Sequence, residues 1–263
     1  MAIYYSFTYY NVLEPAQFIG ADNYIKLFTD DSIFLTSLKN TLLIAIVTGP
    51  TSYMLCFFLA WMLNDLNPKI RAVLTVAFYA PTMATSVYMV WTYIFSGDRY
   101  GLLNSILLRL NFVKTPIVFL KNPDYMLMVV IVVTLWMSLG TSFLAFIAGF
   151  QGLDKTLFEA GAVEGIKNRW QELWYITLPS MRPQLMFGAV MQISAAFSVG
   201  AIGDALIGFP SVDYATHTMI NHLNDYGSFR FELGYACAFA TVLFFITVGT
   251  NKLVNILLSK LGK

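Results

Sequence analysis

The chain has 263 residues, of which 57% are hydrophobic and 12% are charged, and its formal net charge is +1. A soluble domain usually carries about 25% charged and about 45–50% apolar residues. This composition excludes an ordinary soluble enzyme and a disordered chain, and the balance of 16 basic and 15 acidic residues gives no sign of a nucleic-acid partner.

Five charge-free windows of 19 to 29 residues dominate the sequence. About 20 helical residues cross a hydrocarbon core of about 30 Å, so each window is long enough to span a membrane. We therefore predict an all-α, polytopic protein of the inner membrane. The windows are 41–63, 72–97, 125–153, 183–203 and 233–251.

The charges between the windows predict the orientation of the chain. Segments 64–71, 151–182 and 252–263 carry nine basic and five acidic residues, whereas 1–40, 98–124 and 204–232 carry seven and ten. Because Lys and Arg accumulate on the cytoplasmic side, the first set is predicted to be cytoplasmic, with the C-terminus inside. The predicted parts are a periplasmic segment 1–40, a transmembrane domain 41–258 and a cytoplasmic tail 259–263.

The first 40 residues begin with the apolar and aromatic stretch from Met1 to Tyr10, which is too short to cross a membrane. It is similar to the outer end of a helix, and we expect that a first transmembrane helix precedes it in the native protein. Within residues 11–40 the pattern predicts a short helix that carries Tyr24, Leu27 and Phe28.

The next two windows carry recognisable breaks and membrane-interface residues. The first contains Gly49-Pro50-Thr51, which predicts a kink. The second ends in Trp91, Tyr93 and Phe95, which are typical of the aromatic belt at a membrane surface. The outer segment that follows, 98–124, contains an amphipathic stretch at 102–110 that we expect to lie along the outer interface.

The segment 151–182 is unusually long for a cytoplasmic turn and has helical patterning. Asp154 is a suitable N-cap for a helix that starts at Lys155. Leu157, Ala160, Gly161 and Gly165 predict an apolar face of very small residues, which would allow another backbone to approach closely. A second helix is predicted from Arg169, and Pro179 should stop or kink it.

This segment resembles the cytoplasmic signature loop (the EAA motif) of permease subunits of bacterial binding-protein-dependent ABC importers. The matching residues are Glu159-Ala160-Gly161, then Gly165 after three residues, and Ile176-Thr177-Leu178-Pro179. Two departures are a Gly at 161 in place of Ala and a spacing between Gly165 and Ile176 that is one residue longer. Flanking segments near Phe18, Tyr100 and Gly234 are similar to the first permease of carbohydrate importers of the maltose or glycerol-phosphate type.

The resemblance implies a type I ABC importer permease fold and a set of partners. A second permease would complete a heterodimer, two ATP-binding subunits would supply energy, and an extracytoplasmic sugar-binding protein would deliver the substrate at loops 98–124 and 204–232. The sequence has no phosphate-binding loop motif, so ATP and Mg²⁺ would be used by the partner ATPase and no cofactor by this chain. The residues implied to couple to the ATPase are Glu159, Ala160, Gly161, Gly165, Ile176, Leu178 and Pro179.

Polar side chains inside two windows are candidates for contact with a sugar, because intramembrane polar groups usually face a cavity or one another. An indole can stack on a sugar ring while hydroxyl and amide groups bind its hydroxyls. For each Ser or Thr the alternative is a hydrogen bond back to its own helix, and for Trp136 it is plain packing. The candidates are Trp136, Ser138, Thr141, Gln192, Ser194 and Ser198.

Other tempting residues favour no catalytic or metal site. His217 and His222 lie five residues apart in an outer loop, without the helical spacing of four or a nearby Cys that a metal site would favour. Cys56 and Cys237 both fall inside windows and are interpreted as small apolar residues. Asp204 is interpreted as a charge at the outer mouth of a span, and no window holds an acidic residue at mid-depth.

Three alternative functions remain open at this point. A permease for a non-sugar solute, such as a polyamine or an amino acid, would share the signature loop. A membrane-embedded enzyme needs clustered Asp or His residues, and 151–182 has no Asp-rich motif and no His. A secondary carrier predicts inverted repeats and a charge in mid-membrane.

Overall fold

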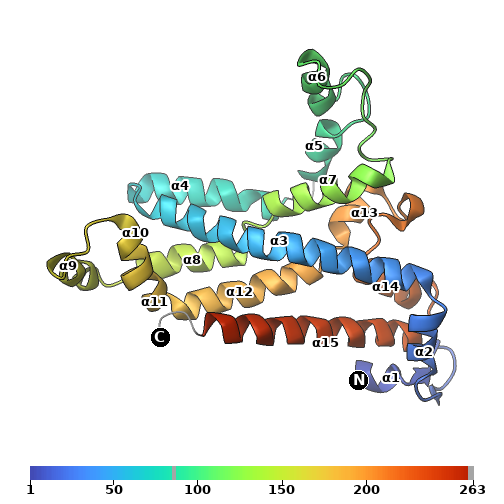
Figure 1. The fold of residues 1–263 in the computed structure, drawn as a ribbon. Helices are drawn as coiled ribbons and strands as arrows, with labels where there is room; N and C mark the ends of the chain where they lie inside the picture. Colours follow the sequence, from blue (N-terminus) through green and yellow to red (C-terminus); the bar gives the residue numbers. More distant parts are fainter. Residues whose placement is uncertain (85–86, 260–263) are drawn as a thin grey trace. The chain divides into compact units, whose positions relative to one another are not determined.

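The computed structural model describes residues 1–84 and 87–259, most of which are helical (Figure 1). Residues 85–86 of the window 72–97, and residues 260–263 of the predicted tail, lie outside the described residues. The chain divides into two compact units. The first consists of Met1–Thr48, Thr85–Trp136 and Ala196–Thr247, and the second of Gly49–Ala84, Met137–Ala195 and Val248–Lys263.

The first unit gathers short elements around the beginnings of two long helices, α3 (Ser32–Asn64) and α15 (Leu233–Leu258). A two-stranded antiparallel sheet pairs Thr8 with Phe18 and Tyr9 with Gln17. The other elements of this unit are α1 (Ala2–Tyr5), β1 (Thr8–Tyr9), β2 (Gln17–Phe18), α2 (Asp22–Thr29), α5 (Val87–Ile94), α6 (Leu102–Arg109), α7 (Pro123–Trp136), α13 (Ala201–Ile207), the 3-10 turn η3 (Val212–Tyr214), α14 (Met219–Asn224) and the π-helical turn η4 (Asp225–Phe229).

The core of the first unit joins α2, α14 and the beginnings of α3 and α15, which also lie together in Figure 1. Its buried side chains include Leu27, Phe34 and Phe239. The helix predicted to carry Tyr24, Leu27 and Phe28 is confirmed as α2, although Phe28 remains half exposed. The apolar spacing of α2 therefore serves to fasten this segment onto the long helices.

The second unit contains the remaining parts of α3 and α15, together with further helices that lie between them in the sequence. Its core is built from large apolar side chains of α3, α8 and α12, among them Phe57, Phe143 and Phe146. Its elements are α4 (Pro68–Tyr79), the 3-10 turn η1 (Ala80–Thr82), α8 (Thr141–Gln151), α9 (Lys155–Val163), α10 (Arg169–Glu172), the π-helical turn η2 (Leu173–Thr177), α11 (Leu178–Ser180) and α12 (Arg182–Phe197), whose last two residues belong to the first unit.

Within residues 1–84 and 87–259, three helical stretches are long and apolar enough to cross a membrane, namely Ser32–Asn64, Pro123–Gln151 and Leu233–Leu258. Two helix pairs, Pro68–Thr82 with Val87–Ile94 and Arg182–Phe197 with Ala201–Ile207, add two more if each pair is one span. These stretches correspond to the five predicted windows and confirm the helical, polytopic class.

The beginning of α3 differs from the edge of its window. The helix starts at Ser32, where the Asp31 carboxylate accepts the Phe34 N–H at 2.8 Å. Lys39 lies just before the charge-free window 41–63. The helix continues through Lys39, because the side chain of this residue is exposed. The sequence predicts a kink at Gly49-Pro50-Thr51. In the structure these residues lie inside the continuous helix α3, where the first unit ends and the second begins.

Candidate functional site

The segment 151–182 folds in the second unit as two short helices joined by a turn. The Asp154 carboxylate accepts the Thr156 N–H at 2.9 Å, and α9 starts at the next residue, Lys155. This hydrogen bond holds the pKa of the Asp154 carboxyl below its usual range. The predicted cap and the predicted start of the helix are therefore confirmed.

The two glycines of this segment do not form the predicted face for a partner. Gly161 is buried, and a Cβ atom at this position would lie 2.7 Å from Ile176 Cδ1, so the close approach is to the chain's own η2. Gly165 lies beyond the end of α9 with φ +98°, a conformation that favours glycine. The prediction of one continuous small face through both glycines is wrong, because the helix ends before Gly165.

The second helix begins at Arg169 as predicted, and the Asn168 side chain accepts the Gln171 N–H at 2.9 Å. It continues through the π-helical turn η2 and the short α11, which contains Pro179, and a new helix begins at Arg182. Pro179 has no N–H to donate to the Tyr175 carbonyl four residues earlier, which is consistent with the irregular π-helical turn before it. Of the signature residues here, Ile176 is buried, Leu178 is half-buried and Pro179 is exposed.

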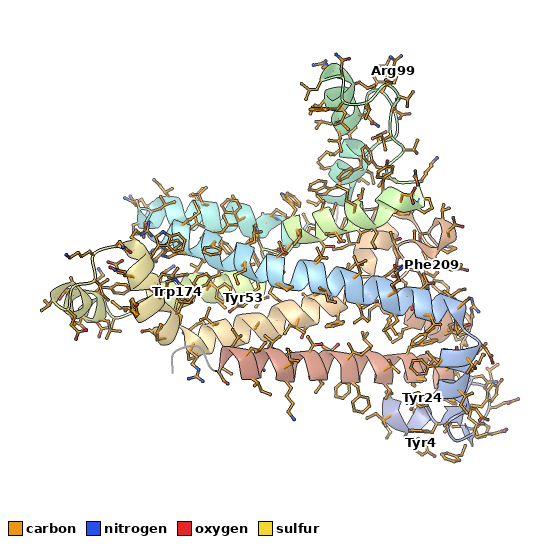
Figure 2. The ribbon with its side chains drawn as sticks, viewed as in Figure 1. Tyr4, Tyr24, Tyr53, Arg99, Trp174 and Phe209 are labelled. Atoms are coloured by element: carbon orange, nitrogen blue, oxygen red, sulfur yellow. The ribbon has the colours of Figure 1, made fainter. Side chains whose placement is uncertain are left out.

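The segment exposes apolar and aromatic side chains beside charged ones. Glu159 and Ala160 are exposed on α9, and Trp174 and Tyr175 are exposed on η2 (Trp174 is labelled in Figure 2). Val163, at the end of α9, is 90% exposed. Large exposed apolar patches on proteins commonly mark interaction sites.

A charged and aromatic contact ties the second helix of the segment to α3. Arg169 forms an ion pair with Asp65, and its guanidinium carbon lies 4.8 Å from the centre of the Trp61 ring. The Trp61 and Trp170 rings lie 5.1 Å apart between centroids. We call Asp65, Arg169, Trp61 and Trp170 the α3 clamp.

Among the candidate sugar-binding residues, the structure brings Gln192 and Ser138 together. The Gln192 side chain is buried, and its Nε2 donates to the Ser138 carbonyl at 3.2 Å and to Cys56 Sγ at 3.1 Å. Ser52 Oγ donates to Gln192 Oε1 at 3.2 Å. Ser138 lies between α7 and α8, and its carbonyl also accepts the Gly140 N–H and the Cys56 thiol, so the Gln192 amide is one of three donors at the break in the helix.

The remaining candidates are exposed. Thr141 and Ser194 are exposed in the second unit, and Ser198 is exposed in the first. Trp136 belongs to the first unit, is 42% exposed and meets Trp91 edge-on at 5.3 Å between ring centroids.

The two histidines meet within the first unit, a contact that their spacing in the sequence does not predict. His217 Nε2 lies 3.1 Å from His222 Nδ1, and His222 Nε2 lies 3.0 Å from Asp31 Oδ2. A capping box at Thr218 starts α14 and brings the two rings together, which a search for helical spacing cannot detect. No group of three or more metal-binding side chains occurs in the described part of the chain.

Comparisons of sequence identify one family. The profile of the family described as "Binding-protein-dependent transport system inner membrane component" matches residues 52–261. The probable ABC transporter permease protein YesP of Bacillus subtilis is 31% identical over 257 residues, which cover 93% of this chain and 79% of the relative. The sulfoquinovosyl glycerol transport system permease protein SmoG of Agrobacterium fabrum is 28% identical over 238 residues, which cover 89% and 74%.

A solved structure has the same fold. The chain is similar, with a TM-score of 0.74 and 21% identity, to a chain in the crystal structure of a bacterial alginate ABC transporter in complex with an alginate pentasaccharide-bound periplasmic protein. The similarity covers 90% of this chain and 82% of that one. The predicted permease fold is therefore confirmed.

Proposed function

Because this chain belongs to the family of inner membrane components of binding-protein-dependent transport systems, we propose that it is the transmembrane subunit of an ATP-driven sugar importer. It forms half of the translocation pathway, and an oligosaccharide is the substrate we favour. The observation that carries the substrate class is the similarity along most of the chain to permeases such as SmoG, which is named for a sugar derivative.

The partners follow from the same proposal. A second permease completes the pathway, two ATP-binding subunits hydrolyse ATP with Mg²⁺, and an extracytoplasmic sugar-binding protein delivers the substrate. The complex with a periplasmic protein in the related alginate transporter supports the last of these. The protein lies in the inner membrane with its C-terminus in the cytoplasm, in keeping with the excess of basic residues in 64–71, 151–182 and 252–263.

The ATPase contacts the segment 151–182 at its exposed surface. Glu159 is the polar anchor, and Ala160 lies beside it without bulk. Gly161, Gly165 and Ile176 act by shaping this surface, since two of them are buried against each other and Gly165 turns the chain. Leu178 and Pro179 end the second helix and set the start of α12.

Contact with the sugar falls to exposed side chains in each unit. Thr141 and Ser194 offer hydroxyls in the second unit, and Ser198 and the Trp136 indole offer a hydroxyl and an aromatic face in the first. Gln192 and Ser138 contribute by holding the broken helix in shape, because the Gln192 amide already has protein partners. Thr141→Ala is expected to weaken sugar transport. Gln192→Glu is expected to have a smaller effect, which is a change in substrate preference.

The decisive experiment is co-purification of the tagged chain from its native operon, followed by an ATP hydrolysis assay. Glu159→Lys is expected to lose the ATPase, because it places a positive charge at the anchor. Glu164→Lys is a matched control, since Glu164 is exposed just beyond α9. A wild-type chain that purifies without an ATPase, or a Glu159→Lys variant that retains it as well as the control does, would contradict the proposal. Sugars that stimulate hydrolysis then identify the substrate.

A further inference from the structure

A chain of buried polar groups crosses the first unit from α3 to an exposed pair of aromatic rings. It begins at Asp31, passes through His222 and His217, and we call these three residues the imidazole chain. The side chain of His222 is 2% exposed and that of Asp31 is 9% exposed. The imidazole chain has no part in the proposed contacts with the ATPase or with the sugar.

When both rings are neutral, the hydrogen bonds fix which nitrogen of each ring carries the proton. His222 Nε2 must donate to the Asp31 carboxylate, so its Nδ1 accepts from His217 Nε2. Both imidazoles are then neutral and carry their proton on Nε2. His217 Nδ1 is left as a buried acceptor with no hydrogen-bond partner within the described residues.

Asp31 is held as an anion by further donors. The Phe34 N–H donates to its Oδ1 at 2.8 Å, and the Tyr235 hydroxyl donates to its Oδ2 at 3.0 Å. Burial alone would raise the pKa of this carboxyl, but these donors and His222 outweigh it and the net shift is downward.

The far end of the imidazole chain reaches the surface through stacked rings. The Phe209 ring stacks on His217 at 5.6 Å and on Phe229 at 6.1 Å between centroids. Phe229 is 68% exposed, and Phe209, labelled in Figure 2, is 38% exposed. The position of this aromatic pair therefore depends on the orientation of the His217 ring.

The backbone of the same loop is fastened to α3. Asn40 Nδ2 donates to the His217 carbonyl at 3.0 Å, and the Met219 N–H donates to Thr41 Oγ1 at 2.9 Å. These bonds hold the backbone, whereas the imidazole chain holds the side chains that face Phe209. We infer that the imidazole chain positions the outer loop 208–224 through two neutral histidines, and that an added proton releases it.

The charges that face the histidines give the sign of the pH dependence. Burial lowers the pKa of His217 to about 4 and also lowers the pKa of His222. Asp31 and Asp225 oppose this shift, and Arg230 reinforces it. Burial raises the pKa of the neighbouring Tyr226 hydroxyl, which therefore remains uncharged in this range, and the Tyr235 hydroxyl keeps the proton that it donates to Asp31. The closed loop, in which the imidazole chain is intact, is therefore most stable above the ordinary histidine pKa of about 6.5. It loses stability as the pH falls from there to about 4, and little further below that.

A proton has no suitable place in the closed arrangement. On His217 Nδ1 it creates a buried donor without an acceptor, and on His222 Nδ1 it removes the acceptor that His217 uses. Because a group with a lowered native pKa favours opening, the opening equilibrium is expected to rise about tenfold for each pH unit between about 6.5 and 4.

The test uses the full chain in lipid nanodiscs with ¹⁵N-labelled histidine, since the sequence contains only these two histidines. Two neutral imidazoles protonated on Nε2 are expected at pH 7, with His217 titrating near pH 4. Hydrogen–deuterium exchange over 208–224, corrected for intrinsic rates, is expected to increase on acidification. An imidazole protonated on Nδ1, or titration of both rings near 6.5, would overturn the inference even if no variant folds.

Two variants assign the acid response to the imidazole chain. His217→Gln keeps an amide donor for His222 but cannot gain a proton, so the acid response of the loop is expected to fall at least about tenfold. Asp213→Asn, in the same loop, is the control and should keep the full response. An equal acid response in His217→Gln and wild type would overturn the inference.

The consequence for transport rests on the proposed function, because the aromatic pair lies in a loop expected to meet the sugar-binding protein. In the assembled transporter, stimulation of ATP hydrolysis by that protein is expected to fall at acidic pH in the wild type and less in His217→Gln. An assembly without ATPase activity at any pH would defeat the proposed function alone. The labelled-histidine and exchange measurements would still decide the inference.

Discussion

The two units of the chain bury different kinds of side chain. Among the buried polar side chains of the described residues, four lie in the second unit and sixteen in the first. The first unit contains the imidazole chain and three asparagines whose amides hold neighbouring backbone, namely Asn23, Asn40 and Asn104. The second unit is filled by large apolar side chains such as Phe57 and Phe146.

This difference teaches how each unit should respond to change. A core of aromatic and aliphatic groups depends on volume and tolerates a substitute of similar size. A buried hydrogen-bond network depends on particular donors and acceptors, and an apolar group of the right size cannot replace them. The second unit should therefore follow side-chain volume, and the first should follow polarity.

The largest effect is expected from Phe146→Ala in the second unit. Phe146 is fully buried and meets Tyr53 and Phe57 edge-on, at 5.4 and 5.6 Å between ring centroids. Removing such a ring costs about 3–5 kcal/mol of unfolding free energy. Phe146→Leu should restore most of this loss, and Phe187→Ala, at a position 48% exposed, should change stability little. Reversible unfolding in mixed micelles measures all three, and equal losses for Phe146→Leu and Phe146→Ala would break the volume rule.

A smaller loss of stability, which depends on polarity and not on volume, is expected from substitution of Asn104 in the first unit. This side chain is fully buried, donates to the Ser96 and Ile117 carbonyls and accepts the Ile117 N–H, each at 2.9 Å. Unpairing these groups should cost about 2 kcal/mol. Asn104→Leu keeps the volume but should be no more stable than Asn104→Ala. Hydrogen–deuterium exchange of residues 96–119 gives the measurement, and wild-type protection in Asn104→Leu would show that packing suffices here.

Features that depend on local chemistry or on long apolar runs could be predicted from the sequence. The five windows correspond to the helical stretches because length and lack of charge decide whether a helix can cross a membrane. Asp154 caps α9 and the second helix begins at Arg169 for reasons contained within a few residues. The signature loop was recognisable because its spacing is almost that of the family.

Features that depend on the meeting of distant segments could not be predicted. His222 and its partner Asp31 are separated by 191 residues, so no local pattern indicates their contact. Gln192 meets Cys56 and the Ser138 carbonyl only because α3 and α12 lie against the break after α7. Gly165 has a positive φ because α9 ends early, and helical spacing alone could not reveal that.

The smallest effect is expected at the α3 clamp, where polarity and packing act together at the surface. The Arg169 and Asp65 side chains are 51% and 46% exposed, so their ion pair should contribute less than about 1 kcal/mol and be screened by salt. The stacking of Arg169 on Trp61 should contribute about 0.5–1 kcal/mol and persist in salt. A double-mutant cycle of Arg169→Gln with Asp65→Asn should therefore show a coupling energy that vanishes near 1 M salt, whereas the cycle with Trp61→Leu should keep its coupling. If both couplings vanish, charge alone holds the clamp; if both persist, the second unit depends on packing even at its polar surface.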